Sequence, residues 1–107
     1  PVTGTVSSIF PTKHALGLVT EAGLEVLVHI GLDTVSLEGK PFDVKVSEGQ
    51  AVAAGYLLVK ADLGAIQAAG RETTTVVVFT NGDVIKSVKL EKTGSLAAKT
   101  VVAKVEL

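Results

Sequence analysis

Two histidines, His14 and His29, are the residues of this chain best suited to chemistry, and the sequence contains no others. Both lie in the stretch HALGLVTEAGLEVLVHIG, at nearly equal distances from the turn EAG at 21–23. An antiparallel hairpin around that turn would place the two side chains opposite each other, with Cβ atoms about 4.5–5.5 Å apart. Facing imidazoles can bind a transition metal, shuttle a proton, or act as a nucleophile and its partner around an anion. The other interpretation is that both are surface histidines without a function.

The sequence gives less support to other chemistries. A zinc site requires at least three protein ligands, and the nearest third candidate, Asp33, is a single carboxylate. We therefore expect no dedicated metal site, and at most incidental metal binding by His14 and His29. The chain has no cysteine, which excludes a thiol nucleophile and a thiolate zinc site. No serine stands in the pattern of a nucleophile elbow, so serine hydrolase chemistry is not expected.

The elements that must position the histidines are strands, because apolar and polar residues alternate with period two along most of the chain. Turn signals rich in Gly, Asn, Asp and Pro separate these runs. A short helix is expected at 62–70, with Asp62 as its N-cap and Gly70 as its left-handed C-terminal cap. The pattern predicts an all-β sandwich or barrel with one short helix. The expected strands are 4–10, 15–19, 24–30, 42–46, 56–61, 73–79, 84–90 and 100–107.

The strand expected at 24–30 indicates which way His29 points. Successive side chains of a strand point to opposite faces, so His29 shares a face with Glu25 and Leu27. The other face carries Leu24, Val26, Val28 and Ile30 and is expected to pack in the core. An imidazole beside a charged residue and an apolar one, on a partly wet face, is typical of a docking surface around a reactive group.

Composition limits the partners and the compartment. Ten Lys and Arg residues balance eleven Asp and Glu residues without forming a run, so a nucleic-acid partner is not expected. The absence of cysteine suits a reducing compartment and favours the cytoplasm. No apolar stretch approaches the roughly 20 residues that span a bilayer, so we expect no membrane insertion. No linker divides the chain, and we expect one domain over residues 1–107.

Four stretches, in the right order along the chain, carry a family resemblance: PVTGTVSSIFPTKHALGL, VLVHIGLDTVSLEGKPF, VSEGQAVAAGYLL and VVVFTN. They resemble the glucose-family IIA phosphocarrier domains of the bacterial sugar phosphotransferase system. The resemblance implies an all-β barrel-sandwich hybrid, a phosphotransferase component that needs no cofactor. Such a domain accepts a phosphoryl group from the histidine phosphocarrier HPr and passes it to a cysteine of a IIB domain. The IIB domain phosphorylates the sugar that enters through the membrane permease IIC, and the resemblance does not determine which sugar.

The resemblance also implies roles for four polar residues. His29 matches the phosphorylated histidine, and His14 matches the assisting histidine that hydrogen-bonds the phosphoryl oxygens. An imidazole with an ordinary pKa of about 6.5 offers a neutral nitrogen at cytoplasmic pH, and its phosphoramidate is labile enough for onward transfer. Thr12 matches a threonine whose hydroxyl orients the ring of His14. Asp33 matches a carboxylate that attracts basic residues of the donor, although it could equally cap a helical turn.

Phe10, Leu27 and Val35 match the apolar rim on which partner proteins of this family dock. Strand alternation independently indicates that Leu27 is exposed. For Phe10 and Val35 the other interpretation is core packing. The family's domains usually continue upstream through further strands, so we expect this sequence to be an N-terminally truncated IIA domain.

Two other classes remain open. A biotin- or lipoyl-type carrier has a similar hammerhead pattern, but it needs an attachment lysine at a hairpin tip, and Lys86 lies within an expected strand. The other class is a regulatory or binding sandwich without catalysis. Replacing His29 distinguishes that class from a phosphocarrier.

Overall fold

A computed structural model describes residues 1–96 and 100–107 of the chain. The described part contains nine strands, one α-helix and two 3-10 turns, which are labelled η1 and η2. The elements are, in chain order, β1 (Gly4–Ile9), β2 (Ala15–Val19), β3 (Glu25–Leu32), η1 (Thr34–Leu37), β4 (Phe42–Val44), β5 (Ala51–Val52), β6 (Val59–Ala61), α1 (Leu63–Ala68), β7 (Glu72–Phe79), η2 (Gly82–Val84), β8 (Ser87–Leu90) and β9 (Ala103–Glu106).

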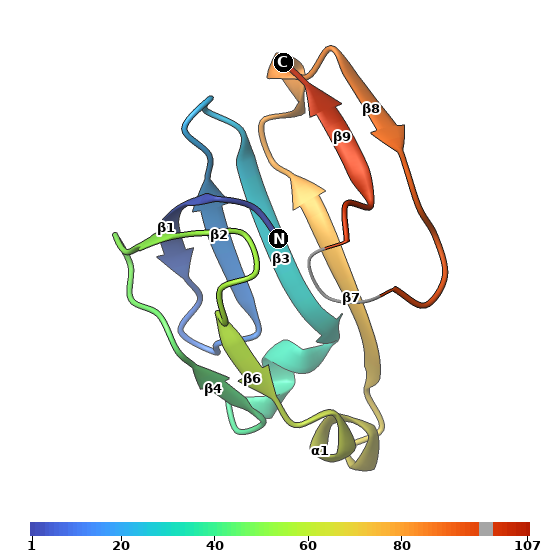
Figure 1. Cartoon of the computed structure of the whole chain (residues 1–107). Helices are drawn as coiled ribbons and strands as arrows, with labels where there is room; N and C mark the ends of the chain where they lie inside the picture. The colour runs from blue at the N-terminus through green and yellow to red at the C-terminus, as the bar shows by residue number, and fades with distance from the viewer. Residues whose placement is uncertain (97–99) are drawn as a thin grey trace.

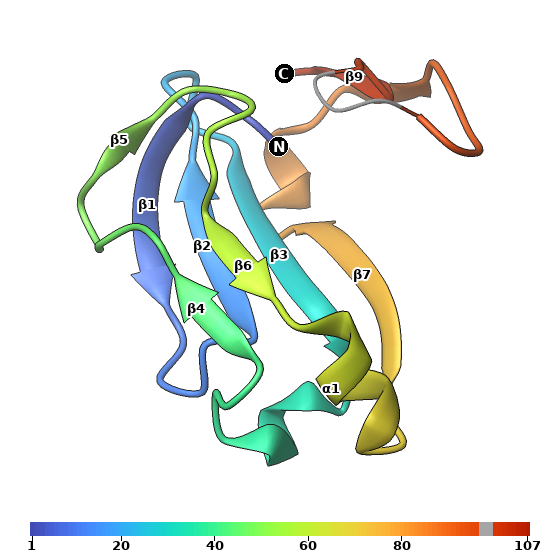
Figure 2. The ribbon, with the colours of Figure 1, turned by 60° about the horizontal axis from the view of Figure 1, so that its bottom comes forward.

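A five-stranded antiparallel sheet in the order β5-β1-β2-β3-β7 forms the main layer (Figure 1). The short pair β4–β6 lies across one face of β1, β2 and β3 as a second layer (Figure 2). The pair β8–β9 forms a separate hairpin next to the end of β7. The predicted all-β sandwich with one short helix is therefore confirmed.

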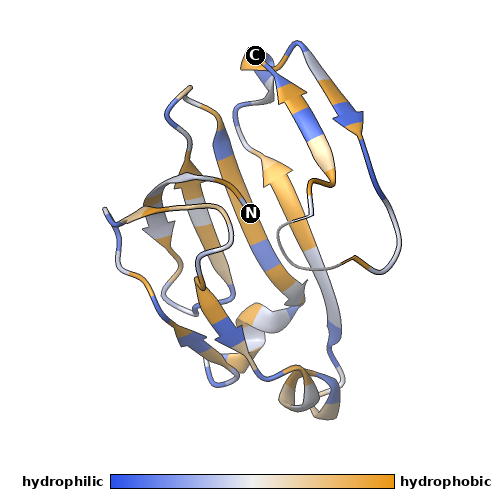
Figure 3. Cartoon of the chain, viewed as in Figure 1, coloured by the Kyte–Doolittle hydropathy of each residue, from blue (hydrophilic) through white to orange (hydrophobic). Residues whose placement is uncertain are grey.

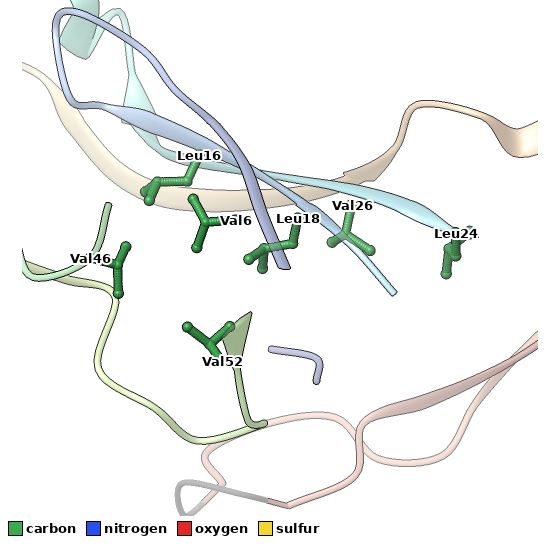
Figure 4. Packing of buried hydrophobic residues seen from close by; sticks show 7 residues of the cluster. All are labelled: Val6, Leu16, Leu18, Leu24, Val26, Val46 and Val52. Carbon is green, nitrogen blue, oxygen red and sulfur yellow. The ribbon is translucent and has the colours of Figure 1, made fainter. Parts of the chain in front are cut away.

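The core lies between the two layers because the inner faces of β1, β2 and β3 are apolar. Leu16, Leu18 and Val26 are 0–1% exposed and point toward Val46, in the loop after β4, and Val52 of β5 (Figure 4). Burying a side chain of this size contributes about 1.5–3 kcal/mol, so these residues fix which face of the sheet is inside. The outer face of β3 is left for His29.

The strand β7 forms one edge of the main sheet and carries exposed apolar side chains. Val76, Val77 and Val78 are 38%, 49% and 41% exposed, and Figure 3 shows the apolar colouring of this part of β7. The interior of the fold is therefore concentrated around β1, β2 and β3, close to the two histidines. The helices in the described part of the chain are too short or too polar to cross a membrane.

Most predicted elements are present, with shifted ends. The helix begins after Asp62, whose carboxylate accepts a hydrogen bond from the N–H of Ala65, and Gly70 has a positive φ of 77°, as predicted. The expectation that 84–86 and 56–58 are strand was wrong, because Val84 lies in η2 and β6 begins only at Val59. The two-residue strand β5 was not predicted, since its strand character comes from pairing with Gly4 and Thr5 of β1.

Candidate functional site

The register of the β2–β3 hairpin places Ala15, and not His14, opposite His29. His14 precedes β2, and its carbonyl oxygen accepts a hydrogen bond of 2.8 Å from the N–H of Ile30. The prediction that the two histidines lie directly opposite each other on adjacent strands was therefore wrong by one residue. In a regular strand this offset would send the side chains to opposite faces.

The two rings nevertheless meet, because His14 stands in an irregular loop. The N–H of Lys13 donates to the carbonyl of Phe10 over 2.7 Å, which closes a tight turn with Pro11 in the position that favours proline. Lys13 follows in the left-handed region with φ 60°, so the chain enters β2 at an angle that strand alternation does not govern. The ring centroids of His14 and His29 are 4.8 Å apart, with an interplanar angle of 76°.

The ring of His14 is held and largely buried. The Oγ1 of Thr12 lies 2.6 Å from Nδ1 of His14, and the residue is 5% exposed. Burial lowers the pKa of His14 below its ordinary value of 6.5, and the nearby His29 lowers it further. Both effects favour the neutral imidazole. Thr12 and His14 belong to the loop between β1 and β2.

His29 lies near the end of β3, and the chain itself determines its tautomer. Nδ1 of His29 is 2.7 Å from the carbonyl oxygen of Gly31. A carbonyl can only accept a hydrogen bond, so Nδ1 must carry the proton and donate, and Nε2 of the neutral ring keeps its lone pair. The geometry thus leaves a nucleophilic nitrogen at Nε2.

Gly31 is the residue of the site that sequence reasoning missed. It has φ 76° and interrupts the pairing of β3 with β7 as a bulge between Ile30 and Leu32. A Cβ at this position would lie 2.5 Å from Cγ2 of Thr34 and 2.8 Å from the carbonyl oxygen of Glu72. A glycine inside an apolar strand pattern, two residues after a candidate nucleophile, was the available signal.

Neither Nε2 atom has a hydrogen-bond partner among the described residues. No buried side-chain nitrogen or oxygen in that part of the chain lacks a partner, so both Nε2 atoms have access to solvent. The pair can therefore face an anion arriving from outside. Within residues 1–96 and 100–107, no group of three or more His, Asp and Glu side chains is arranged to hold a metal ion.

The remaining predicted residues lie in or next to the segments that carry the two rings. Phe10 is 37% exposed, and its ring lies 5.4 Å from that of His14 at 86°. Leu27 is half-buried and lines, together with Phe10, a groove on the outer face of β1, β2 and β3. Val35 is 50% exposed on η1, which begins three residues after Gly31.

Asp33 lies between β3 and η1, but its side chain does not cap this turn. It adopts the left-handed conformation with φ 57°, and the carbonyl oxygen of Asp33, not the carboxylate, accepts the hydrogen bond from the hydroxyl of Ser36. The helix-cap interpretation was therefore wrong, because the usual N-cap backbone is extended. The carboxylate of Asp33 remains exposed beside the site.

Comparison with known proteins identifies the family. Residues 1–85 match the family model of the phosphoenolpyruvate-dependent sugar phosphotransferase system, EIIA 1. The chain belongs to this EIIA family. It is 42% identical to the solved glucose permease IIA from Mycoplasma capricolum, with a TM-score of 0.88 over 96% of this chain and 66% of that one.

Several curated relatives support the same EIIA assignment. The chain is 87% identical over all 107 residues to the PTS system glucose-specific EIICBA component of Streptococcus pneumoniae, and spans 15% of its length. It is 46% identical over 99 residues to the beta-glucoside-specific EIIBCA component of Bacillus subtilis, and spans 16% of that protein. It is also 46% identical over 89 residues to the glucose-specific EIIA component of Bacillus cereus, of which it spans 54%. Membership of the EIIA family favours neither the biotin- or lipoyl-type carrier nor the non-catalytic sandwich.

Proposed function

We propose that this chain is a phosphocarrier of the sugar phosphotransferase system and that His29 is its phosphoryl acceptor. The observation that carries the proposal is the hydrogen bond from Nδ1 of His29 to the carbonyl of Gly31, because it leaves the lone pair on the solvent-accessible Nε2. Membership of the EIIA family and the names of the relatives support a role in the sugar phosphotransferase system.

The reaction has two displacements at phosphorus. In the first, the lone pair of His29 Nε2 attacks the phosphoryl group of phospho-HPr, and the breaking P–N bond returns its electron pair to the donor's imidazole. In the second, a thiolate of the IIB domain attacks the phosphorus, and the P–N bond to His29 breaks, which restores the neutral ring. Neither step requires a cofactor, so the work of the site is positioning and charge stabilisation.

His14 is proposed to stabilise the transferring group. If the hydroxyl of Thr12 donates to Nδ1 of His14 across their 2.6 Å contact, the neutral ring carries its proton on Nε2. The lowered pKa of His14 supports the neutral form. Its Nε2–H would then donate to a phosphoryl oxygen held next to His29, the kind of fixed donor that stabilises charge in a transition state.

Docking is assigned to the surface beside the rings. We propose that Phe10, Leu27 and Val35 contact HPr and the IIB domain, and that the carboxylate of Asp33 attracts basic residues of HPr. The fused EIICBA and EIIBCA relatives support a partnership with IIB and IIC domains. We propose that the chain acts in the cytoplasm, together with the IIB domain. The name of the 87% identical relative supports glucose as the transported sugar.

The test is phosphorylation by the upstream chain of donors. The protein is incubated with phosphoenolpyruvate, HPr and the kinase of HPr, and is then analysed by mass spectrometry at neutral pH. We expect one added phosphate on His29 that is lost in acid, and no phosphate on the variant His29→Ala. An unphosphorylated wild-type chain would support the regulatory binding class instead. Phosphorylation of the His29→Ala variant would show that another residue is the phosphoryl acceptor.

A further inference from the structure

Three rings from three segments of the chain pack edge to face in a row next to the bulge at Gly31. Phe10 follows β1, His14 precedes β2, and His29 belongs to β3. The centroid distances are 5.4 Å from Phe10 to His14 and 4.8 Å from His14 to His29, and the interplanar angles are 86° and 76°. His14 is thus packed perpendicularly between an aromatic ring and the proposed acceptor.

A single hydrogen bond does not fix the plane of an imidazole. The torsion that turns a histidine ring has broad, shallow minima, so the ring can rock or flip about it. Thr12 holds one atom of His14, Nδ1, at 2.6 Å. The direction of Nε2, which has to meet the phosphoryl oxygens, depends on what packs against the faces and edges of the ring.

Phe10 is in a position to supply that restraint. Its own place is fixed from both ends of the loop, because its N–H donates to the carbonyl of Ala15 over 3.1 Å and its carbonyl accepts from Lys13 over 2.7 Å. Its ring contacts His14 in the edge-to-face arrangement that aromatic pairs prefer. Phe10 is 37% exposed while His14 is 5% exposed, and the contact with the phenyl ring contributes to the burial of the imidazole.

We propose that Phe10 is a positioning residue for phosphoryl transfer, whose ring holds the imidazole of His14 in the plane that directs Nε2 toward the group carried on His29. This inference rests on the proposed phosphocarrier function. It assigns Phe10 a role within the site in addition to the docking role implied by the family resemblance. The two roles predict different kinetics, since docking affects the KM for HPr and positioning affects kcat.

The experiment compares Phe10→Leu and Phe10→Ala with the wild-type protein. We expect kcat for transfer from phospho-HPr to fall about tenfold in Phe10→Leu, because a small misplacement of a catalytic group is costly, while the KM changes less than kcat. The ring nitrogens of His14 are followed by nitrogen-15 NMR in the absence of any partner. In the wild type we expect one dominant tautomer with the proton on Nε2, and in both variants a shift toward a mixture of the two tautomers.

The pKa of His14 provides a second readout of the same samples. Phe10→Ala exposes the ring of His14 to water, so the pKa of His14 is expected to rise toward its ordinary value. His29 still faces this ring and Lys13 is still adjacent in the chain, so the charges near His14 do not change. Tyr56→Leu is the matched control, because it removes another exposed ring, from the loop before β6, and is expected to leave the kinetics and the His14 spectrum unchanged. Val35→Ala is expected to raise KM without changing the His14 tautomer.

The outcomes separate the alternatives. Unchanged His14 spectra together with a raised KM in Phe10→Leu would overturn the positioning role and leave Phe10 as a docking residue only. Failure of the wild type to accept phosphate would instead overturn the phosphocarrier proposal, and the NMR comparison would still show whether Phe10 orients His14. If Phe10→Ala does not fold, Phe10→Leu decides the question alone.

Discussion

The ring of His29 donates its Nδ1 proton to the carbonyl oxygen of Gly31, two residues further along the same strand, over 2.7 Å. This contact exists because β3 is bulged at Gly31, where φ is 76°. A regular strand would direct this carbonyl into the ladder with β7. The bulge therefore turns a backbone oxygen into the group that selects the tautomer of the proposed acceptor.

Replacing Gly31 is expected to damage stability and transfer together. In Gly31→Ala the new methyl group would collide with Thr34, which is fully buried, and with the backbone of Glu72. Gly23→Ala is the matched control, since Gly23 also has a positive φ, 93°, but no atom within 4 Å of a new Cβ. We expect Gly23→Ala to lose about 1–2 kcal/mol from left-handed strain. Gly31→Ala should lose about 1–3 kcal/mol more from overpacking, measured by chemical denaturation.

The same pair of variants tests the link to chemistry. Gly31→Ala is expected to slow phosphorylation of His29 under conditions in which the protein remains folded, whereas Gly23→Ala should transfer at the wild-type rate. Equal loss of stability in the two variants would show that the bulge tolerates a side chain. In that case a residue other than glycine could also place its carbonyl oxygen within hydrogen-bond distance of Nδ1 of His29.

Thr12 is expected to act through its hydroxyl. Thr12→Val keeps the shape of the side chain but removes the 2.6 Å contact with Nδ1 of His14. We expect the transfer rate to fall about 10- to 100-fold, the size of effect that loss of an orienting hydrogen bond has on metal-binding histidines. Thr12→Ser restores a hydroxyl and should recover most of the rate in stopped-flow transfer from phospho-HPr. No recovery in Thr12→Ser would indicate that the methyl group, and so packing, is what matters.

His14 should make stability depend on pH in a defined direction. Its pKa in the folded chain lies below the ordinary value of 6.5, chiefly because of burial. Below pH 6.5 the unfolded chain binds more protons at His14 than the folded chain does. The contribution of the neutral His14 to the free energy of unfolding is therefore fully present above pH 6.5 and is lost as the pH falls toward the folded-state pKa. The slope from this one group cannot exceed about 1.4 kcal/mol per pH unit.

The measurement is urea denaturation between pH 7.5 and 5, in about half-unit steps, on the wild type and His14→Gln. Subtracting the two curves removes the contribution of carboxylates, which are common to both proteins. The difference is expected to shrink as the pH falls, because the wild type alone must bury a neutral imidazole. A difference that is constant across this range would show that burial does not depress the pKa of His14.

Asp33 is expected to influence association more than chemistry. Its carboxylate is exposed and makes no capping hydrogen bond. Asp33→Asn should therefore raise the KM for HPr about two- to fivefold, as expected for an exposed charge pair, with kcat nearly unchanged. The effect should fade as salt is raised, because screening at 0.15 M extends over about 8 Å. Asp83→Asn, at the exposed turn η2, is the control, and an equal effect there would indicate a general effect of net charge.

Local pattern determined much of this protein in advance. Alternation along 24–30 placed Leu24 and Val26 in the core and left Glu25 exposed with His29 on its side of the strand, as the structure shows. Asp62 and Gly70 marked the ends of the helix because capping and left-handed conformations depend on a few neighbouring residues. These features follow from interactions within one element, so the order of residues is sufficient to predict them.

The geometry of the site was decided only by tertiary structure. The register of the hairpin depends on the hydrogen bonds of its turn, and it placed Ala15 opposite His29. His14 reaches His29 through a left-handed residue at Lys13, and Nε2 of His29 is left free by a bulge against β7. Sequence pattern does not specify backbone conformation in loops and bulges, because their free energy is set by contacts with segments far along the chain. The identity of the two rings was therefore readable in the sequence, while their contact and their tautomers required the folded chain.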